Sequence, residues 1–227
     1  MTDWSGGIGT LGTMTAMSAR LHLVRHGEVD NPERILYGRL PGYPLTDRGH
    51  RMAAMAAESV DRTVARVYAS PLERAQQSAA PWAQRANVEL RTEHRIIEPV
   101  NAFEGKTLAS IRALRDPRML RLVWNPFLPT WGEPYRAIAA RVEAAMTDAL
   151  DELDESGDEG DVVFVSHQAP IWITHRHLAG QRLWHDPRGR RCALSSITTF
   201  ERRGDRLVEV GYDDPAASVP AIDLGAV

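Results

Sequence analysis

Four consecutive residues, Arg25-His26-Gly27-Glu28, place a guanidinium, an imidazole and a flexible backbone side by side. A neutral imidazole is a competent nucleophile toward phosphorus. A neighbouring guanidinium favours that neutral form, because a second positive charge close by is unfavourable. The segment is therefore a candidate anion-handling loop with His26 as its nucleophile, although these four residues alone would also fit a surface turn.

Two later segments carry groups of related chemistry. Arg74 ends the run Ser70-Pro71-Leu72-Glu73-Arg74, and His167 follows Val165-Ser166. A guanidinium can hold two phosphoryl oxygens at once. A lone arginine on a helix is more often a solvated surface residue, but Arg25, Arg74 and His167 each come soon after a strand-like run. Their common position predicts that they form one phosphate site.

The expected reaction explains why these residue types would be needed together. During phosphoryl transfer, negative charge spreads over three equatorial oxygens. Fixed cations and an imidazole can stabilise that charge in place of a divalent metal ion. An alkoxide leaving group also needs a proton, which a carboxyl group can supply. The motifs therefore predict phosphate chemistry that requires no metal and no other cofactor.

Taken in order over residues 20–212, these motifs resemble those of the histidine phosphatase superfamily, the phosphoglycerate mutase-like proteins. Within the superfamily the chain looks most similar to an uncharacterised actinobacterial branch. The resemblance implies that His26 attacks phosphorus and becomes transiently phosphorylated. It also implies a phosphate pocket whose members are Arg25, Arg74, the catalytic His167 and, as a further contact, Asn31.

The resemblance also implies a general acid between the second and the last motif. Glu98 follows the strand-like pair Ile96-Ile97 and precedes Phe103-Glu104-Gly105, which is similar to the family pattern. We therefore prefer Glu98 to Glu104 as the catalytic acid. It would protonate the leaving oxygen and then accept a proton from the hydrolytic water.

Three local features depart from the family pattern. Gln168 follows His167 where many members have glycine, and Tyr37-Gly38-Arg39 replaces a more usual Gln-Gly. The segment Val29-Asp30-Asn31 is one residue shorter than usual, which weakens the assignment of Asn31. These changes are expected to reshape the leaving-group side of the site without disturbing phosphate binding.

Three functions are compatible with the motifs. We favour a phosphomonoesterase that acts on a small phosphorylated metabolite and releases inorganic phosphate. A phosphoglycerate mutase-type phosphotransfer would use the same phosphohistidine but must exclude water, and the segment 99–135 does not resemble the longer insertion that mutases carry. A non-catalytic phosphate-binding module is disfavoured, because the nucleophile, the cations and an acid are all present.

The elements that must position these groups alternate between strands and helices. Strand-like runs cover 21–24, 64–68 and 161–165, and helical patterns follow each of them at 46–60, 71–86 and 170–178. Two late strands, near 193–200 and 207–212, flank a turn at Gly204-Asp205. This alternation predicts a three-layer α/β/α sandwich with a mostly parallel central sheet, in which ligands bind at the carboxyl ends of the strands.

The chain length favours one domain, over residues 20–213. Residues 1–19 are expected to be a disordered leader or an over-extended start, and 214–227 a flexible tail. The Pro-rich and aromatic segment 99–135 is interpreted as an insertion that either packs over the sheet or covers the substrate. Its arginines fit either a second anionic group on the substrate or a solvated surface; they are Arg112, Arg115, Arg118 and Arg121.

Composition narrows the range of partners. A formal net charge of -3 gives no overall attraction to nucleic acid. No apolar run approaches the roughly 18 residues that span a membrane. The single Cys192 cannot form an intramolecular disulfide and fits a reducing cytosol. We therefore expect a cytoplasmic protein whose ligand is small; the sequence indicates no oligomeric state.

Overall fold

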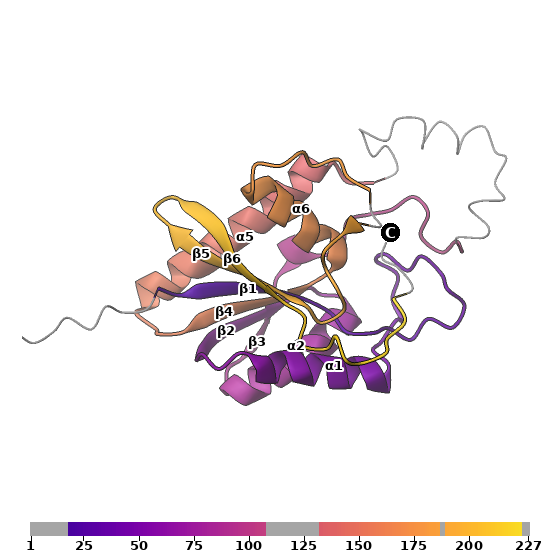
Figure 1. Cartoon of the computed structure of the whole chain (residues 1–227), viewed down its shortest axis with the longest axis horizontal. Coiled ribbons are helices and arrows are strands. Elements are labelled where there is room, and N and C mark those ends of the chain that lie inside the picture. The colour runs from indigo at the N-terminus through magenta and orange to yellow at the C-terminus, as the bar shows by residue number, and fades with distance from the viewer. Residues whose placement is uncertain (1–17, 108–131, 187–188, 224–227) are drawn as a thin grey trace, which may run out of the picture.

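The computed structural model describes residues 18–107, 132–186 and 189–223, and within them one sheet has the strand order β3-β2-β4-β1-β5-β6 (Figure 1). The strands β3, β2, β4 and β1 run parallel, and β5 and β6 are antiparallel to their neighbours. The sheet is therefore mostly parallel, as predicted. The strand bounds are β1 Arg20–Arg25, β2 Val64–Ala69, β3 Leu90–Thr92, β4 Asp161–Ser166, β5 Ile197–Arg203 and β6 Arg206–Asp213.

Helices cover both faces of this sheet. Helices α1 (Asp47–Ser59) and α2 (Glu73–Ala86) lie on one face, and α5 (Tyr135–Ser156) and α6 (Gln168–Leu178) lie on the other (Figure 1). A short 3-10 turn, η1 (His94–Ile96), follows β3. The predicted three-layer α/β/α sandwich is confirmed.

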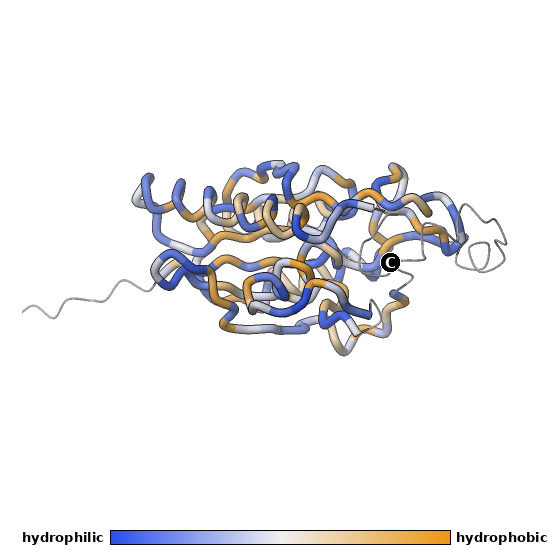
Figure 2. The backbone as a smooth tube through the Cα atoms, turned by 90° about the horizontal axis from the view of Figure 1, so that it is seen from above, coloured by the Kyte–Doolittle hydropathy of each residue, from blue (hydrophilic) through white to orange (hydrophobic). Residues whose placement is uncertain are grey.

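The central strand β4 divides the apolar core into two halves. Successive side chains of a strand point to opposite faces. Val162 and Phe164 belong to the core cluster under α5, whereas Val163 and Val165 belong to the cluster under α1 and α2. All four side chains are completely buried. Figure 2 shows that hydrophobic stretches alternate with hydrophilic ones along the chain and that many outer turns are hydrophilic.

One element was not predicted and one prediction was wrong. The three-residue strand β3 is too short to show an alternating pattern. The acidic residues of 148–156 lie on the solvent side of the last turns of α5, while Leu150 and Leu153 are buried. Ile96-Ile97 does not form a strand: Ile96 ends the 3-10 turn η1.

The predicted insertion and ends lie partly outside the described residues. Asn101 and Gly132, at the two flanks of the insertion 99–135, form one β-bridge. Thr107 forms another with Ile35, which lies in the loop after β1. Its four arginines, like residues 1–17, fall outside the description. In the segment suggested as a tail, Ala216 packs with Met52 of α1 and with Leu194.

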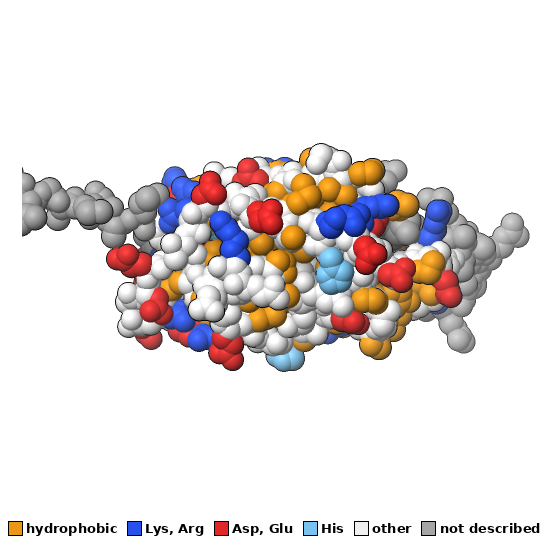
Figure 3. Space-filling model, turned by 90° about the horizontal axis from the view of Figure 1, so that it is seen from below, with side chains coloured by type: hydrophobic (Ala, Val, Ile, Leu, Met, Phe, Trp, Pro, Cys, Tyr) orange, Lys and Arg blue, Asp and Glu red, His pale blue; other side chains and the backbone are white. Residues whose placement is uncertain are grey.

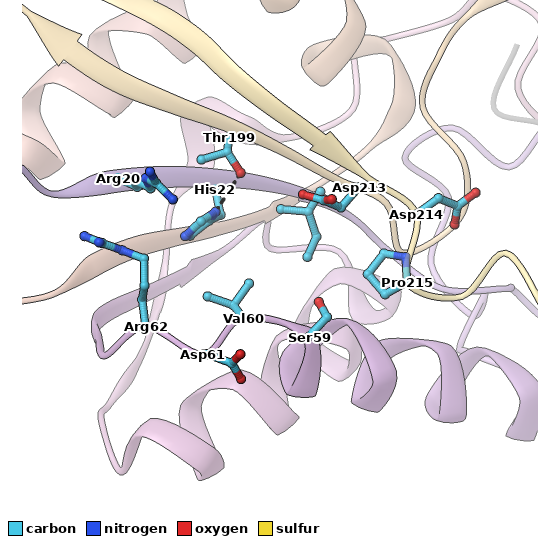
Figure 4. A pocket seen from close by; sticks show the side chains of 11 residues that line it. Arg20, His22, Ser59, Val60, Asp61, Arg62, Thr199, Asp213, Asp214 and Pro215 are labelled. Atoms are coloured by element: carbon cyan, nitrogen blue, oxygen red, sulfur yellow. Dashed lines mark hydrogen bonds between the residues drawn. The ribbon is translucent and has the colours of Figure 1, made fainter.

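A buried carboxylate ties the start of β1 to β4 and to the loop before β2. Asp161 has no exposed side-chain surface, and it accepts bonds from Arg62 Nε at 2.6 Å and from the Arg20 amide at 2.9 Å. His22 Nε2 lies 3.1 Å from the same carboxylate, and His22 Nδ1 lies 3.0 Å from the Thr199 hydroxyl. Beside this cluster is a cavity of about 420 Å³ that Arg20, His22, Arg62 and Thr199 help to line (Figure 4).

This cluster predicts how stability responds to acid. Burial alone would raise the pKa of Asp161, but hydrogen bonds from His22, Arg62 and Arg20 lower it to about 2 from an ordinary 3.8. A carboxylate with a depressed folded-state pKa stabilises the fold above its unfolded pKa, and this stabilisation is lost as the pH falls toward the folded value. We expect Asp161→Asn to lower the free energy of unfolding at pH 7 by about 2 kcal/mol, the energy of that pKa difference.

Urea unfolding at pH 7 and at pH 3 measures this effect. The variant should lose less stability than the parent between these two pH values. Asp205→Asn, in the exposed β5–β6 turn, is the control and should leave both measurements unchanged. Equal acid sensitivity in the parent and in Asp161→Asn would contradict the prediction.

Candidate active site

The three sequence motifs meet at one edge of the sheet. Strands β2, β4 and β1 are adjacent and parallel, so their carboxyl ends lie together. The His26 amide donates to the Ser166 carbonyl at 3.1 Å, and the Ser70 amide donates to the Val165 carbonyl at 3.0 Å. The predicted juxtaposition of the strand ends is therefore confirmed.

His26 is held as a neutral imidazole with one nitrogen available. Its side chain is fully buried, and Nδ1 donates to the Gly27 carbonyl at 2.8 Å, because a carbonyl can only accept. Nε2 therefore carries the lone pair, and no hydrogen-bond partner meets it. Burial, followed by the charges of Arg74 and Arg25, holds the pKa of His26 well below its ordinary value. His26 thus presents an unprotonated ring nitrogen at neutral pH.

Glycine is required beside the nucleophile because the backbone of α1 approaches closely. A Cβ on Gly27 would lie 2.4 Å from the carbonyl oxygen of Gly49. The Gly27 amide donates to Ser78 Oγ at 3.0 Å, and that hydroxyl donates to the Arg74 carbonyl at 2.7 Å. The loop after β1 is therefore fixed against both α1 and α2.

Arg74 lies in the first turn of α2, as predicted, and is almost fully buried. Its Nη2 donates to the Gly38 carbonyl at 2.7 Å, and its guanidinium lies over the Tyr37 ring at 4.6 Å. Burial lowers its pKa. Among the described residues, no carboxylate forms an ion pair with Arg74, and its buried Nε has no partner. Such a guanidinium has donors left for an anion.

Arg25 differs because a carboxylate from the C-terminal segment holds it. Nη1 and Nη2 donate to the two Asp223 oxygens at 2.7 and 2.8 Å, and Nη1 also donates to the Cys192 carbonyl at 2.7 Å. Burial would lower the pKa of Arg25, but the pair with Asp223 outweighs it and leaves the pKa raised. Its buried Nε has no partner. No sequence motif indicated Asp223.

His167 faces the nucleophile from the end of β4. The two imidazole centroids are 5.2 Å apart, and His167 Nε2 lies 2.7 Å from the Ser70 hydroxyl. Burial, then the charge of Arg74, holds the pKa of His167 well below its ordinary value. If the hydroxyl donates to Nε2, the proton of the neutral ring lies on Nδ1, which is buried without a partner. His167 can then donate to a bound oxyanion.

Glu98 is buried beside these cations, whereas Glu104 is engaged in its own loop. Burial raises the pKa of Glu98, and the charges of Arg74 and Arg190 oppose that rise most strongly. Glu98 Oε2 has no hydrogen-bond partner. Glu104 Oε1 instead accepts from the backbone amides of Arg39 at 3.1 Å and Asn101 at 3.3 Å. The geometry supports Glu98 as the proton donor, although the strand expected before it is absent.

Asn31 and Glu28 both bind the surrounding backbone. The side-chain Nδ2 of Asn31 donates to the Ile35 carbonyl at 2.9 Å, and its Oδ1 accepts from the Ile35 backbone amide at 3.0 Å. Glu28 accepts from the Thr46 hydroxyl at 2.7 Å and from the Ile222 amide at 2.8 Å. Both side chains shape the loops around the nucleophile, and a phosphate contact by Asn31 stays a prediction.

The polar atoms without partners define what the site can bind. Among the described residues, no hydrogen-bond partner meets the buried nitrogens Arg25 Nε, Arg74 Nε, His26 Nε2 and His167 Nδ1 or the oxygen Glu98 Oε2. Buried polar groups are normally paired. Guanidinium donors around a neutral imidazole and a protonatable carboxyl suit a phosphoryl group with a leaving oxygen. No group of three or more His, Cys, Asp and Glu that could hold a metal ion occurs in the described part of the chain.

A known protein family, curated proteins and solved structures resemble this chain over most of its length. The family model of the histidine phosphatase superfamily (branch 1) matches residues 21–215. The uncharacterised protein Rv0525 of Mycobacterium tuberculosis is 50% identical over 200 residues, which cover 87% of this chain and 97% of that protein. The mycobacterial glucosyl-3-phosphoglycerate phosphatase Rv2419c, solved with VO3, matches with a TM-score of 0.70 and 26% identity over 85% of this chain and 98% of its own. A structure named mycobacterial hydrolase 1 has the same TM-score and identity over 86% and 98% of the two chains.

Arg74 is buried without an ion pair to any described carboxylate. A substitution there should therefore change phosphate affinity without lowering the stability of the fold. We expect Arg74→Met to weaken the binding of inorganic phosphate at least tenfold, about the effect of losing one or two charged hydrogen bonds. Removing a buried charge that lacks a carboxylate partner should not destabilise the fold and can stabilise it. Titration calorimetry and thermal unfolding measure the two effects.

Arg85→Met on the exposed side of the same helix is the matched control, and it should leave phosphate affinity unchanged. Phosphate binding to Arg74→Met with the affinity of the parent would remove Arg74 from the site.

Proposed function

Because the chain belongs to the histidine phosphatase superfamily, we propose that it is a phosphomonoesterase that acts on a small phosphorylated metabolite through a phosphohistidine at His26. The observation that carries this proposal is the buried His26 Nε2, deprotonated and without a partner, among Arg25, Arg74 and His167. That nitrogen is available to attack phosphorus.

The reaction would proceed in two displacements. His26 Nε2 attacks phosphorus, an N–P bond forms, and the bond between phosphorus and the ester oxygen breaks. Glu98 gives its proton to the leaving oxygen, and the alcohol departs. Glu98, now a carboxylate, accepts a proton from water as the water oxygen attacks phosphorus. The N–P bond then breaks, inorganic phosphate leaves, and both residues return to their first state.

The fixed charges would stabilise both transition states. Guanidinium groups of Arg25 and Arg74 and an N–H of His167 surround the site where charge develops on the phosphoryl oxygens. Because these groups are buried, water screens them little. We expect them to make a divalent metal ion or another cofactor unnecessary.

A small substrate also agrees with the surface. On the face shown in Figure 3, acidic and basic side chains are interspersed, without a broad field of one sign. Nucleic-acid binding depends on such a basic field. Among the described helices none is long and apolar enough to cross a membrane. Cys192 is a buried free thiol, which supports our proposal of a cytoplasmic location.

His26→Ala should abolish turnover. We expect phosphate release from p-nitrophenyl phosphate to fall by at least about a thousandfold, because the nitrogen that would attack phosphorus is removed. When the reaction of the parent is quenched during turnover, His26 should carry a phosphoryl group. Chelators should not reduce the activity of the parent. Stopped assays and mass spectrometry measure these outcomes.

His50→Ala, an exposed histidine on α1, is the control and should retain parental turnover. Full activity of His26→Ala would remove the nucleophile assignment. Isomerisation of phosphoglycerate faster than its hydrolysis would identify a mutase instead.

Glu98→Gln should affect poor leaving groups most. An alkyl phosphate needs the proton of Glu98, whereas nitrophenolate leaves with little protonation, so kcat for the alkyl ester should fall by a further ~100-fold. Burial raises the pKa of Glu98. The parent should therefore lose activity on alkyl phosphates as the pH rises through that raised pKa, and Glu98→Gln should lack this alkaline limb.

Glu104→Gln separates the two candidate acids. It should keep the alkaline limb and the parental response to leaving groups. Equal slowing of both substrates by Glu98→Gln, or loss of the alkaline limb in Glu104→Gln, would contradict our assignment.

A further inference from the structure

A third arginine borders the site and was not indicated by any motif. Arg190 lies two residues before Cys192, whose carbonyl holds Arg25. Its Nη1 donates to Gln168 Oε1 at 3.2 Å, and Gln168 directly follows His167. Arg190 therefore contacts the residue that follows His167 and lies two residues from the one whose carbonyl binds Arg25.

Arg190 is partly buried, and no described carboxylate forms an ion pair with it. Burial lowers the pKa of Arg190, as it lowers that of Arg74. Of the charges around Arg190, that of Glu98 opposes this lowering most strongly. The two residues nevertheless form no ion pair, and no other described carboxylate pairs with Arg190. A buried charge without a partner is costly, so an anion supplied by a ligand would stabilise it.

Neutral groups fix the direction of this guanidinium. Arg190 Nε donates to His185 Nε2 at 3.0 Å, and His185 Nδ1 donates to the Leu183 carbonyl at 2.7 Å. The His185 ring packs against Tyr135, with centroids 5.7 Å apart. Burial lowers the pKa of His185, so its Nε2 remains an acceptor at neutral pH. The scaffold holds Arg190 in place without neutralising it.

The position relative to Glu98 indicates which part of a substrate Arg190 would meet. In the proposed mechanism Glu98 protonates the leaving oxygen, so groups beside it contact the alcohol portion of the ester. Arg74 and Arg190 exert the two strongest attractions on the Glu98 carboxyl. Arg74 contacts Gly38 and Tyr37, whereas Arg190 contacts Gln168, the residue that follows His167. From these different contacts we assign Arg190 to the leaving-group side.

We propose that Arg190, aimed by Gln168 and His185, is a specificity-determining residue that binds a second anionic group on the alcohol portion of the phosphomonoester. This rests on the proposed phosphatase function and names its substrate class: phosphomonoesters that also carry a carboxylate or a second phosphate. Gln168 supplies the side-chain acceptor that holds Arg190, which a glycine at this position could not do.

Three substrates on one carbon frame test this proposal. Glycerol 1-phosphate has a neutral hydroxymethyl group where 3-phosphoglycerate has a carboxylate and glycerol 1,3-bisphosphate has a phosphate. We expect the parent to prefer at least one anionic member over glycerol 1-phosphate by about tenfold or more in kcat/KM. Arg190→Gln should reduce this ratio to near one, mainly through KM of the anionic substrate.

Further variants separate charge, direction and location. Arg190→Lys should keep part of the preference, because a point charge remains but the planar fork is lost. Gln168→Ala should reduce the preference without removing it. Arg182→Gln, which removes an exposed charge from the same loop, should leave the ratio unchanged. Each variant is assayed at its own pH optimum, since Arg190 also influences Glu98.

The outcomes distinguish this proposal from the function on which it rests. Failure of the parent to release phosphate from any of these substrates or from p-nitrophenyl phosphate would overturn the phosphatase function itself. Turnover with no anionic preference, or with a preference that Arg190→Gln retains, would overturn only the role of Arg190. An equal loss on all substrates would place Arg190 in the phosphate-binding or structural set. Preference for the carboxylate or for the bisphosphate identifies the second group.

Discussion

Positive charge buried at the ends of three parallel strands governs the other groups of the site. Arg25 and Arg74 are almost completely removed from water, and both lower the pKa of His26 and of His167. Burial lowers both pKa values most, and together with these charges it keeps both histidines neutral, as the proposed roles of nucleophile and donor require. Glu98 responds in the opposite sense, because its burial raises the pKa more than the nearby cations lower it. One electrostatic setting thus prepares both a base-like nitrogen and an acid.

Such a site opposes the stability of the fold that holds it. Buried guanidinium groups without carboxylates lose hydration, and the unpaired atoms around them add to the cost. The two apolar clusters on either side of β4 supply the opposing stabilisation. The Asp161 cluster lies at the amino ends of β1 and β4, away from the site at their carboxyl ends. The stabilising Asp161 cluster and the buried charge of Arg74, which has no described carboxylate partner, therefore lie at opposite ends of the parallel strands.

Local sequence patterns predicted much of this arrangement. In β1, β2 and β4 each apolar run is followed at once by the residues of its motif. Strand ends and motifs could therefore be located together. Asp223 could not be found this way, because it meets Arg25 across 198 residues of sequence. Arg190 lies among several arginines, and its contacts with Gln168 and His185 distinguish it. Glu98 was chosen partly for a strand that proved to be a 3-10 turn, yet burial among cations supports it independently.

The two sides of the site are built from different kinds of structure, and this has a consequence for relatives. Residues that would hold the phosphoryl group come from strand ends and the first turns of helices, whose positions the sheet fixes. Gln168, His185 and Arg190 form the proposed leaving-group side, and two of them lie in the segment between α6 and β5. Loops accept substitution more easily than strands. Proteins that share the β1, β2 and β4 motifs can therefore bind the same phosphoryl group while differing in the alcohol they release, so substrate is better inferred from Arg190 and its partners than from the motifs.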